Sequence, residues 1–223
     1  MALDAVKIKA VIFDIDGTLS DSDDQLVDQV ERLLEPFLFL IRESGRKSAA
    51  RWLVMALESP GNFIYHLADR FDLDHIIVRL LNKSGKKKIK KQRDYRIISG
   101  VPEMLASLTT KYPLAVVSAR DEKSSMAFID QFGLTSFFRV IVTSQTTRRT
   151  KPFPDPLLYA AEKLDVPPAN CLMVGDTTVD MRAAKRAGMQ AVGVLCGFGH
   201  EKELRRAGAD EIFPLTTDLS RIL

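Results

Sequence analysis

Short apolar runs alternate with segments of helical spacing along most of this chain. The runs predict buried strands, and they cover residues 10–13, 114–117, 138–142, 171–174, 191–195 and 211–213. Between the later runs, the apolar spacing predicts helices at 102–110, 122–131, 155–164, 180–187 and 201–207, with a last turn or helix in the tail. Strands that alternate with helices in this way predict an α/β fold with a parallel, doubly wound, Rossmann-like sheet.

The pattern is different between residues 22 and 96. Apolar residues recur at helical spacing from Leu26 to Ile41, and further apolar helical stretches follow, whereas no segment predicts a strand. We therefore expect two domains. Residues 1–21 and 97–223 would form the α/β core domain, and residues 22–96 would form an all-helical domain inserted directly after the first strand.

The first strand is followed by two carboxylates, a glycine and a hydroxyl, in the order Asp14-Ile15-Asp16-Gly17-Thr18. In an extended chain residues i and i+2 share a face, so both carboxylates could approach one reacting centre. This arrangement suits a nucleophile with a neighbouring acid/base, or two ligands for a hard metal ion. The structural alternative is an Asp pair in a turn, with Gly17 providing the bend.

Polar residues also follow the later strands. Ser118 follows the second strand, Lys151 lies in the loop after the third, and Asp176 and Asp180 follow the fourth. Each alone has a structural explanation: Ser118 and Lys151 as turn or loop residues, Asp176 as a helix cap with Asp180 on that helix's surface. Ligands of open α/β sheets bind beyond the carboxyl ends of the strands, so convergence at this edge predicts a site.

Phosphoryl transfer explains why these residue types belong together. At an effective dielectric constant of ~20, two unit charges about 4 Å apart repel by roughly 4 kcal/mol, which opposes attack of a carboxylate on a phosphate. A magnesium ion and a fixed ammonium would cancel this repulsion. Asp14 and Asp176 can supply the one or two carboxylates that Mg²⁺ prefers, Lys151 the ammonium, and Ser118 or Thr18 hydroxyl donors.

These residues, in this order, resemble the four motifs of the haloacid dehalogenase-like hydrolases, and the resemblance covers residues 8–22 and 97–213. It implies that Asp14 is the nucleophile and Asp16 the general acid/base, with Thr18, Ser118 and Lys151 also in the catalytic set. It implies that Mg²⁺ contacts Asp14, the backbone carbonyl of Asp16 and Asp176, with Asp180 behind them. By the same resemblance, the substrate would contact Gly17, Ser118, Ala119 and Lys151.

The resemblance also implies an activity. We expect a phosphatase that hydrolyses a small phosphorylated metabolite through an aspartyl-phosphate, similar to the phosphoglycolate phosphatases, with residues 22–96 as the family's small helical cap. A β-phosphoglucomutase-like phosphotransferase is the alternative, because a phosphorylated Asp14 can donate to a sugar as well as to water. Asp16 disfavours dehalogenation, since family members that dehalogenate lack this residue, and it argues against phosphonate cleavage by a cap lysine.

Charge and composition add little about partners. The chain has a net charge of +3, but residues 79–96 hold nine Lys or Arg and one Asp. A solvated face is the simplest interpretation, and binding of an anionic partner without catalysis is the alternative of another class. Little aromatic interleaving argues against nucleic acid. The sequence predicts no membrane span, signal peptide or disulfide framework, so we expect a cytoplasmic protein; it indicates no oligomeric state.

Overall fold

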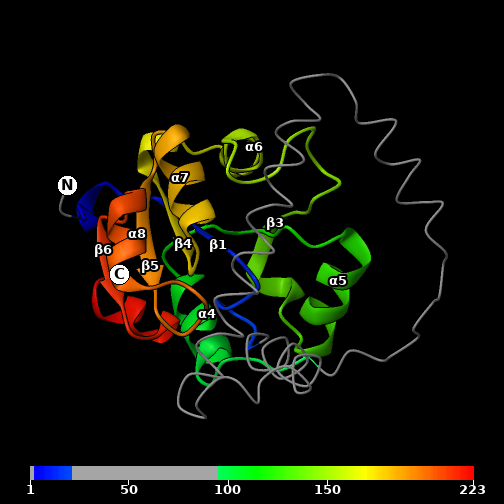
Figure 1. Ribbon diagram of the computed structural model, residues 1–223. Helices are drawn as coiled ribbons and strands as arrows, with labels where there is room; N and C mark the ends of the chain where they lie inside the picture. Colours follow the sequence, from blue (N-terminus) through cyan, green and yellow to red (C-terminus); the bar gives the residue numbers. More distant parts are fainter. Residues whose placement is uncertain (1–2, 22–94) are drawn as a thin grey trace, which may run out of the picture. The chain divides into compact units, whose positions relative to one another are not determined.

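The computed structural model describes residues 3–21 and 95–223, which belong to one compact unit (Figure 1). Residues 22–94 lie outside this description. The predicted helical cap therefore stays a prediction, and so does any role of the basic segment 79–96, of which only Tyr95 and Arg96 are described. Nothing in the described part is long and apolar enough to be a membrane-spanning helix.

The core of the unit is a six-stranded parallel sheet with the strand order β3-β2-β1-β4-β5-β6. The strands are β1 (Ala10–Phe13), β2 (Leu114–Val117), β3 (Phe138–Val142), β4 (Cys171–Gly175), β5 (Gln190–Val194) and β6 (Glu211–Phe213). This is a parallel, doubly wound, Rossmann-like sheet, which is the fold class predicted from the sequence, whereas the strand order comes from the structure. From β1 the chain adds strands first on one side of the sheet (β2, β3) and then on the other (β4, β5, β6), so the switch point lies between β1 and β4. Ligands of such sheets bind at the switch point, beyond the carboxyl ends of the strands.

Helices cover both faces of the sheet. They are α4 (Val101–Leu108), α5 (Glu122–Gln131), α6 (Asp155–Leu164), α7 (Thr178–Arg186) and α8 (Glu201–Ala207), and the 3₁₀ helix η5 (Thr216–Arg221) follows β6. Alternate residues of β1 enter two separate cores. Val11 and Phe13 pack in the core with α4, α5 and η5, whereas Ala10 and Ile12 pack in the core with α6, α7 and α8. Burial on both faces explains why β1 is a continuous apolar run rather than an alternating one.

The bounds predicted from the sequence differ from the structure mainly around the fourth and fifth strands. β4 includes Gly175, β5 lies one residue earlier than expected, and α7 begins at Thr178 instead of residue 180. The reason for the earlier start is a capping box. The Thr177 side chain accepts a hydrogen bond from the backbone N–H of Asp180, and the Asp180 carboxylate accepts one from the backbone N–H of Thr177. The alternative in which Asp176 caps this helix and Asp180 lies on its surface is therefore wrong.

Candidate active site

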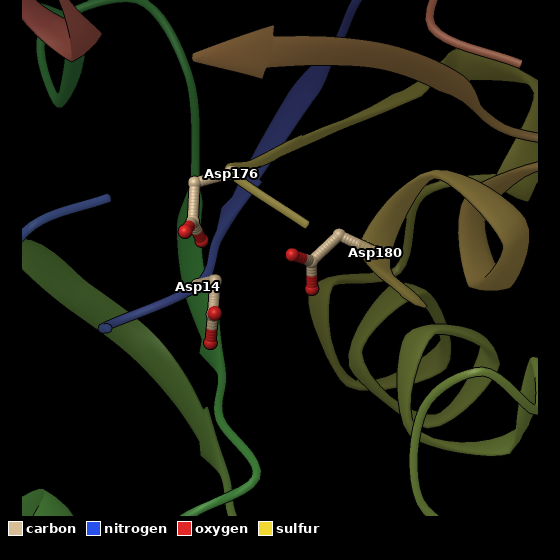
Figure 2. A group of neighbouring side chains, drawn as sticks. All are labelled: Asp14, Asp176 and Asp180. Atoms are coloured by element: carbon tan, nitrogen blue, oxygen red, sulfur yellow. The ribbon is translucent and has the colours of Figure 1, made fainter. Parts of the chain in front are cut away.

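Three buried carboxylates meet beyond the ends of β1 and β4. Asp14 directly follows β1, Asp176 directly follows β4, and Asp180 is in the first turn of α7. Because β1 and β4 are hydrogen-bonded neighbours, their carboxyl ends lie side by side. Figure 2 shows the three side chains next to one another, and each offers an oxygen atom within 4.8 Å of the others. The cluster lies at the switch point of the sheet, where the sequence predicts a site.

Lys151 is the cation of this cluster. Its Nζ lies 2.8 Å from Oδ1 of Asp14 and donates hydrogen bonds to Oδ1 of Asp180 at 2.7 Å and to the carbonyl of Val117 at 2.9 Å. The ammonium has three protons, and these three acceptors match them. The side chain is only 4% exposed. Lys151 therefore fixes one full positive charge against Asp14, as the sequence analysis expected.

Burial and charge oppose each other at this pair. Burial raises the pKa of Asp14 to about 7, with the charge of Lys151 opposing the rise and those of Asp180 and Asp16 adding to it. Burial alone would lower the pKa of Lys151, but Asp14 and Asp180 outweigh it and raise this pKa above its ordinary value. Lys151 thus stays protonated. A cation in the cluster would favour the ionised form of Asp14.

Asp176 is held by two loops. Its carboxylate accepts hydrogen bonds from the backbone N–H of Phe198 at 2.9 Å and from the Thr18 hydroxyl at 3.4 Å. Glycines make room for it, because a Cβ atom on Gly17 or Gly197 would lie 2.3 or 2.1 Å from Oδ2. Gly17 also has a φ of +64°, which L side chains rarely adopt. Residues 197 and 198 were not predicted as site residues from the sequence, because they follow β5 and carry no catalytic side chain.

The Thr18 loop is tied to the C-terminal part of the chain. The Thr216 hydroxyl donates to the carbonyl of Thr18 at 2.6 Å, and the Cys196 thiol donates to the carbonyl of Gly17 at 3.3 Å. Burial raises the pKa of the Cys196 thiol, so the sulfur stays a protonated donor at neutral pH. Thr216 and Cys196 were not expected at the site. Their contribution is to hold the loop that carries Gly17 and Thr18.

Asp16 is paired with a cation that the sequence analysis did not include. The guanidinium of Arg120 donates from Nε to Oδ2 at 2.7 Å and from Nη2 to Oδ1. Ser118 is buried, and its Oγ accepts a hydrogen bond from the backbone N–H of Arg120 at 3.1 Å, while Ala119 is exposed. The only sequence signal for Arg120 was its place two residues after Ser118.

The donor set fits a hard divalent cation. All three clustered side chains offer carboxylate oxygens, which such ions prefer, and the described residues place no His or Cys among them. Asp180 differs from the other two, because Oδ1 accepts from Lys151 and Oδ2 accepts from Thr177. Its main visible role is to hold Lys151 and the start of α7. Asp14 and Asp176 are therefore the better candidates for direct ligands.

Comparison with known proteins agrees with this arrangement. A family model described as haloacid dehalogenase-like hydrolase matches residues 11–194. The chain is 33% identical over 200 residues to the phosphoglycolate phosphatase of Neisseria meningitidis serogroup A, covering 86% of this chain and 82% of that protein. It is 32% identical over 200 residues to the phosphoglycolate phosphatase of Neisseria gonorrhoeae, with the same coverage. A solved structure of a hydrolase from Pseudomonas syringae is 26% identical, with 96% of both chains covered and a TM-score of 0.65.

Proposed function

This chain belongs to the haloacid dehalogenase-like hydrolase family, and we propose that it is a magnesium-dependent phosphatase acting on a small phosphomonoester such as phosphoglycolate. One observation carries the proposal: Lys151 Nζ contacts both Asp14 and Asp180 while a third buried carboxylate, Asp176, lies beside them. A buried nucleophile, a fixed cation and an oxygen-donor cluster are the parts that phosphoryl transfer to a carboxylate requires. The two relatives at 33% and 32% identity support the substrate class.

In the first half of the reaction, an oxygen of Asp14 attacks phosphorus. The bond between phosphorus and the ester oxygen breaks, and its electron pair goes to that oxygen, which takes a proton from the Asp16 carboxyl. The product alcohol leaves, and Asp14 carries the phosphoryl group as an acyl phosphate. Lys151 stabilises the charge that Asp14 and the phosphoryl oxygens bring together, and the Ser118 hydroxyl donates a hydrogen bond to a phosphoryl oxygen.

In the second half, a water molecule attacks the same phosphorus atom. The Asp16 carboxylate takes a proton from this water, the bond between phosphorus and the Asp14 oxygen breaks, and inorganic phosphate leaves. The enzyme returns to its starting state with Asp16 protonated and Asp14 ionised. We propose that Asp14, the backbone carbonyl of Asp16 and Asp176 hold Mg²⁺, with Asp180 behind them. When bound, the ion neutralises charge on the phosphoryl oxygens.

The direct test is phosphate release from a panel of phosphate esters. The panel includes phosphoglycolate and hexose phosphates, each assayed with Mg²⁺ and with EDTA. We expect Mg²⁺-dependent release from at least one small monoester, and little release in EDTA. Phosphate release that persists unchanged in EDTA would contradict the assigned ligands. Rearrangement of a hexose phosphate without net release would instead identify a phosphotransferase.

Binding of Mg²⁺ to the carboxylate cluster can be measured separately from catalysis. Titration calorimetry with Mg²⁺ alone should show weaker binding for Asp176→Asn than for the unaltered protein, because the substitution removes one anionic oxygen donor. Asp165→Asn is the matched control. Asp165 is exposed at the C-terminal end of α6, where its φ of 57° is one that Asn also tolerates. Equal Mg²⁺ affinity in both variants would exclude Asp176 as a ligand.

A further inference from the structure

Arg120 lies against Asp16 in a geometry that has a specific chemical meaning. Two of its nitrogens, Nε and Nη2, donate to the two different oxygens of the same carboxylate. This bidentate fork fixes the plane of the carboxylate as well as its position. Both Asp16 oxygens accept a hydrogen bond in this contact, and an ionised carboxylate offers acceptor sites on both of its oxygens. The fork therefore suits the carboxylate form of Asp16, which is the form that the proposed mechanism requires for hydrolysis of the aspartyl-phosphate.

The guanidinium itself is held firmly. It stacks on two aromatic rings, with the Arg120 Cζ atom 5.1 Å from the centre of the Tyr95 ring and 5.6 Å from that of Phe128. The two rings also contact each other edge to face at a centroid distance of 6.0 Å. The side chain of Arg120 is only 10% exposed. Asp16 is therefore hydrogen-bonded to a guanidinium whose own position is restrained by burial and by two aromatic rings.

The backbone of Arg120 is fixed as well. Its N–H donates to Oγ of Ser118, and its carbonyl accepts from the backbone N–H of Ser144, which follows β3. Within the described part of the chain, Nη1 of Arg120 is buried without a hydrogen-bond partner. The contacts of Arg120 are therefore made by its backbone and by Nε and Nη2, the two nitrogens that face Asp16.

We propose that Arg120 is a positioning residue that orients the Asp16 carboxylate for the second half of the reaction, when it takes a proton from water. This inference rests on the proposed function. After Asp16 has protonated the leaving oxygen it is ionised, which is the form that the fork holds. Arg120 therefore acts on hydrolysis of the aspartyl-phosphate and not on its formation.

The two half-reactions can be separated with p-nitrophenyl phosphate. Its leaving group departs without a proton, so formation of the aspartyl-phosphate depends little on Asp16, whereas hydrolysis still requires the base. For Arg120→Ala we expect kcat to fall about 10²-fold, which is the low end for a general base. KM should fall in parallel, and kcat/KM should stay within about threefold, because kcat/KM reports only the steps through aspartyl-phosphate formation. A rapid burst of about one p-nitrophenolate per active site should precede the slow steady state.

Two further variants sharpen the test. Arg120→Lys keeps a cation but not the planar fork, so it should show the same split between kcat and kcat/KM with a smaller loss; it also serves if Arg120→Ala does not fold. Arg206→Ala, an exposed position on α8, is the matched control and should behave as the unaltered enzyme.

The outcomes separate this inference from the proposed function. If the unaltered enzyme turns over but the Arg120 variants lose kcat and kcat/KM equally, or lose neither, the inference is wrong and the phosphatase proposal stands. If the unaltered enzyme releases no phosphate from any ester, both are rejected. A burst together with parallel falls in kcat and KM supports the inference.

Discussion

The ammonium of Lys151 lies 2.8 Å from Oδ1 of Asp14, and both side chains are buried. An unpaired charge in the interior costs several kcal/mol, so each of the two charges offsets part of the free-energy cost of burying the other. The same contact places a positive charge beside the atom that would attack phosphorus. In the proposed mechanism, stability and catalysis therefore depend on the same ion pair.

Replacing Lys151 by methionine tests both parts of this statement. The substitution keeps an unbranched side chain but leaves Asp14 and Asp180 buried without their shared cation. We expect the free energy of unfolding at neutral pH to fall by about 3–5 kcal/mol. We expect kcat to fall roughly 10²- to 10³-fold, as for loss of a single fixed donor in an active site. Chemical denaturation and phosphate release measure the two effects, and exposed Lys202→Met is the control. A Lys151→Met enzyme with unaltered kcat would exclude the assigned role.

The raised pKa of Asp14 predicts how stability changes with pH. In the folded protein without metal this pKa is about 7, against an ordinary value of 3.8, because the carboxyl is buried. Between these values the folded state holds a proton that the unfolded state releases, so Asp14 lowers stability as the pH rises. This destabilisation grows by at most about 1.4 kcal/mol per pH unit, and it stops growing once the pH is above the pKa of Asp14 in the folded protein.

This pH effect is measured by comparing Asp14→Asn with the unaltered protein in EDTA. Asparagine does not titrate, so the variant should become progressively more stable than the unaltered protein as the pH rises from about 4 to about 7. Asp165→Asn, at an exposed position, is measured beside it as the control for the loss of one carboxylate charge. Parallel stability curves for Asp14→Asn and the unaltered protein would mean that burial does not raise this pKa.

Gly17 and Gly133 form a natural pair for testing the space around Asp176. Both have positive φ, of +64° and +65°, so alanine introduces similar backbone strain at each. At residue 17 the new Cβ would also lie 2.3 Å from Oδ2 of Asp176, whereas at residue 133 no atom of the described residues, chain neighbours aside, lies within 4 Å. We expect Gly17→Ala to be less stable than Gly133→Ala by about 1–3 kcal/mol.

The same pair of variants also tests function. Gly17→Ala should weaken Mg²⁺ binding by displacing the Asp176 carboxylate, and Gly133→Ala should bind Mg²⁺ as the unaltered protein does. Denaturation and Mg²⁺ titration measure these effects. Similar stability and similar Mg²⁺ affinity of the two variants would show that the close contact at Gly17 is unimportant.

The strands and helices of the α/β core followed from local sequence patterns. β1, β2 and β3 have the bounds that the apolar runs predict, because each run is short and is followed at once by a polar residue. The parallel arrangement also pointed to the place of the site, since parallel strands present their carboxyl ends at one edge of the sheet. That β1 and β4 are neighbours came from the structure.

What the sequence did not reveal depends on contacts between distant segments. Arg120 is separated by 104 positions from Asp16, and the backbone N–H of Phe198 by 22 positions from Asp176. A backbone donor leaves no signature in a sequence, and an arginine after a strand is usually a surface residue. Asp180 was expected near the site, but its capping box with Thr177 became evident only once the start of α7 was known.

The central claim is that Asp14 receives the phosphoryl group. The most direct measurement is to quench the enzyme during turnover, treat it with borohydride, which reduces an acyl phosphate to an alcohol, and sequence the peptides by mass spectrometry. We predict homoserine at position 14 in a substrate-dependent manner, and no turnover in Asp14→Asn. Turnover with an unmodified Asp14, together with full activity of Asp14→Asn, would contradict the account.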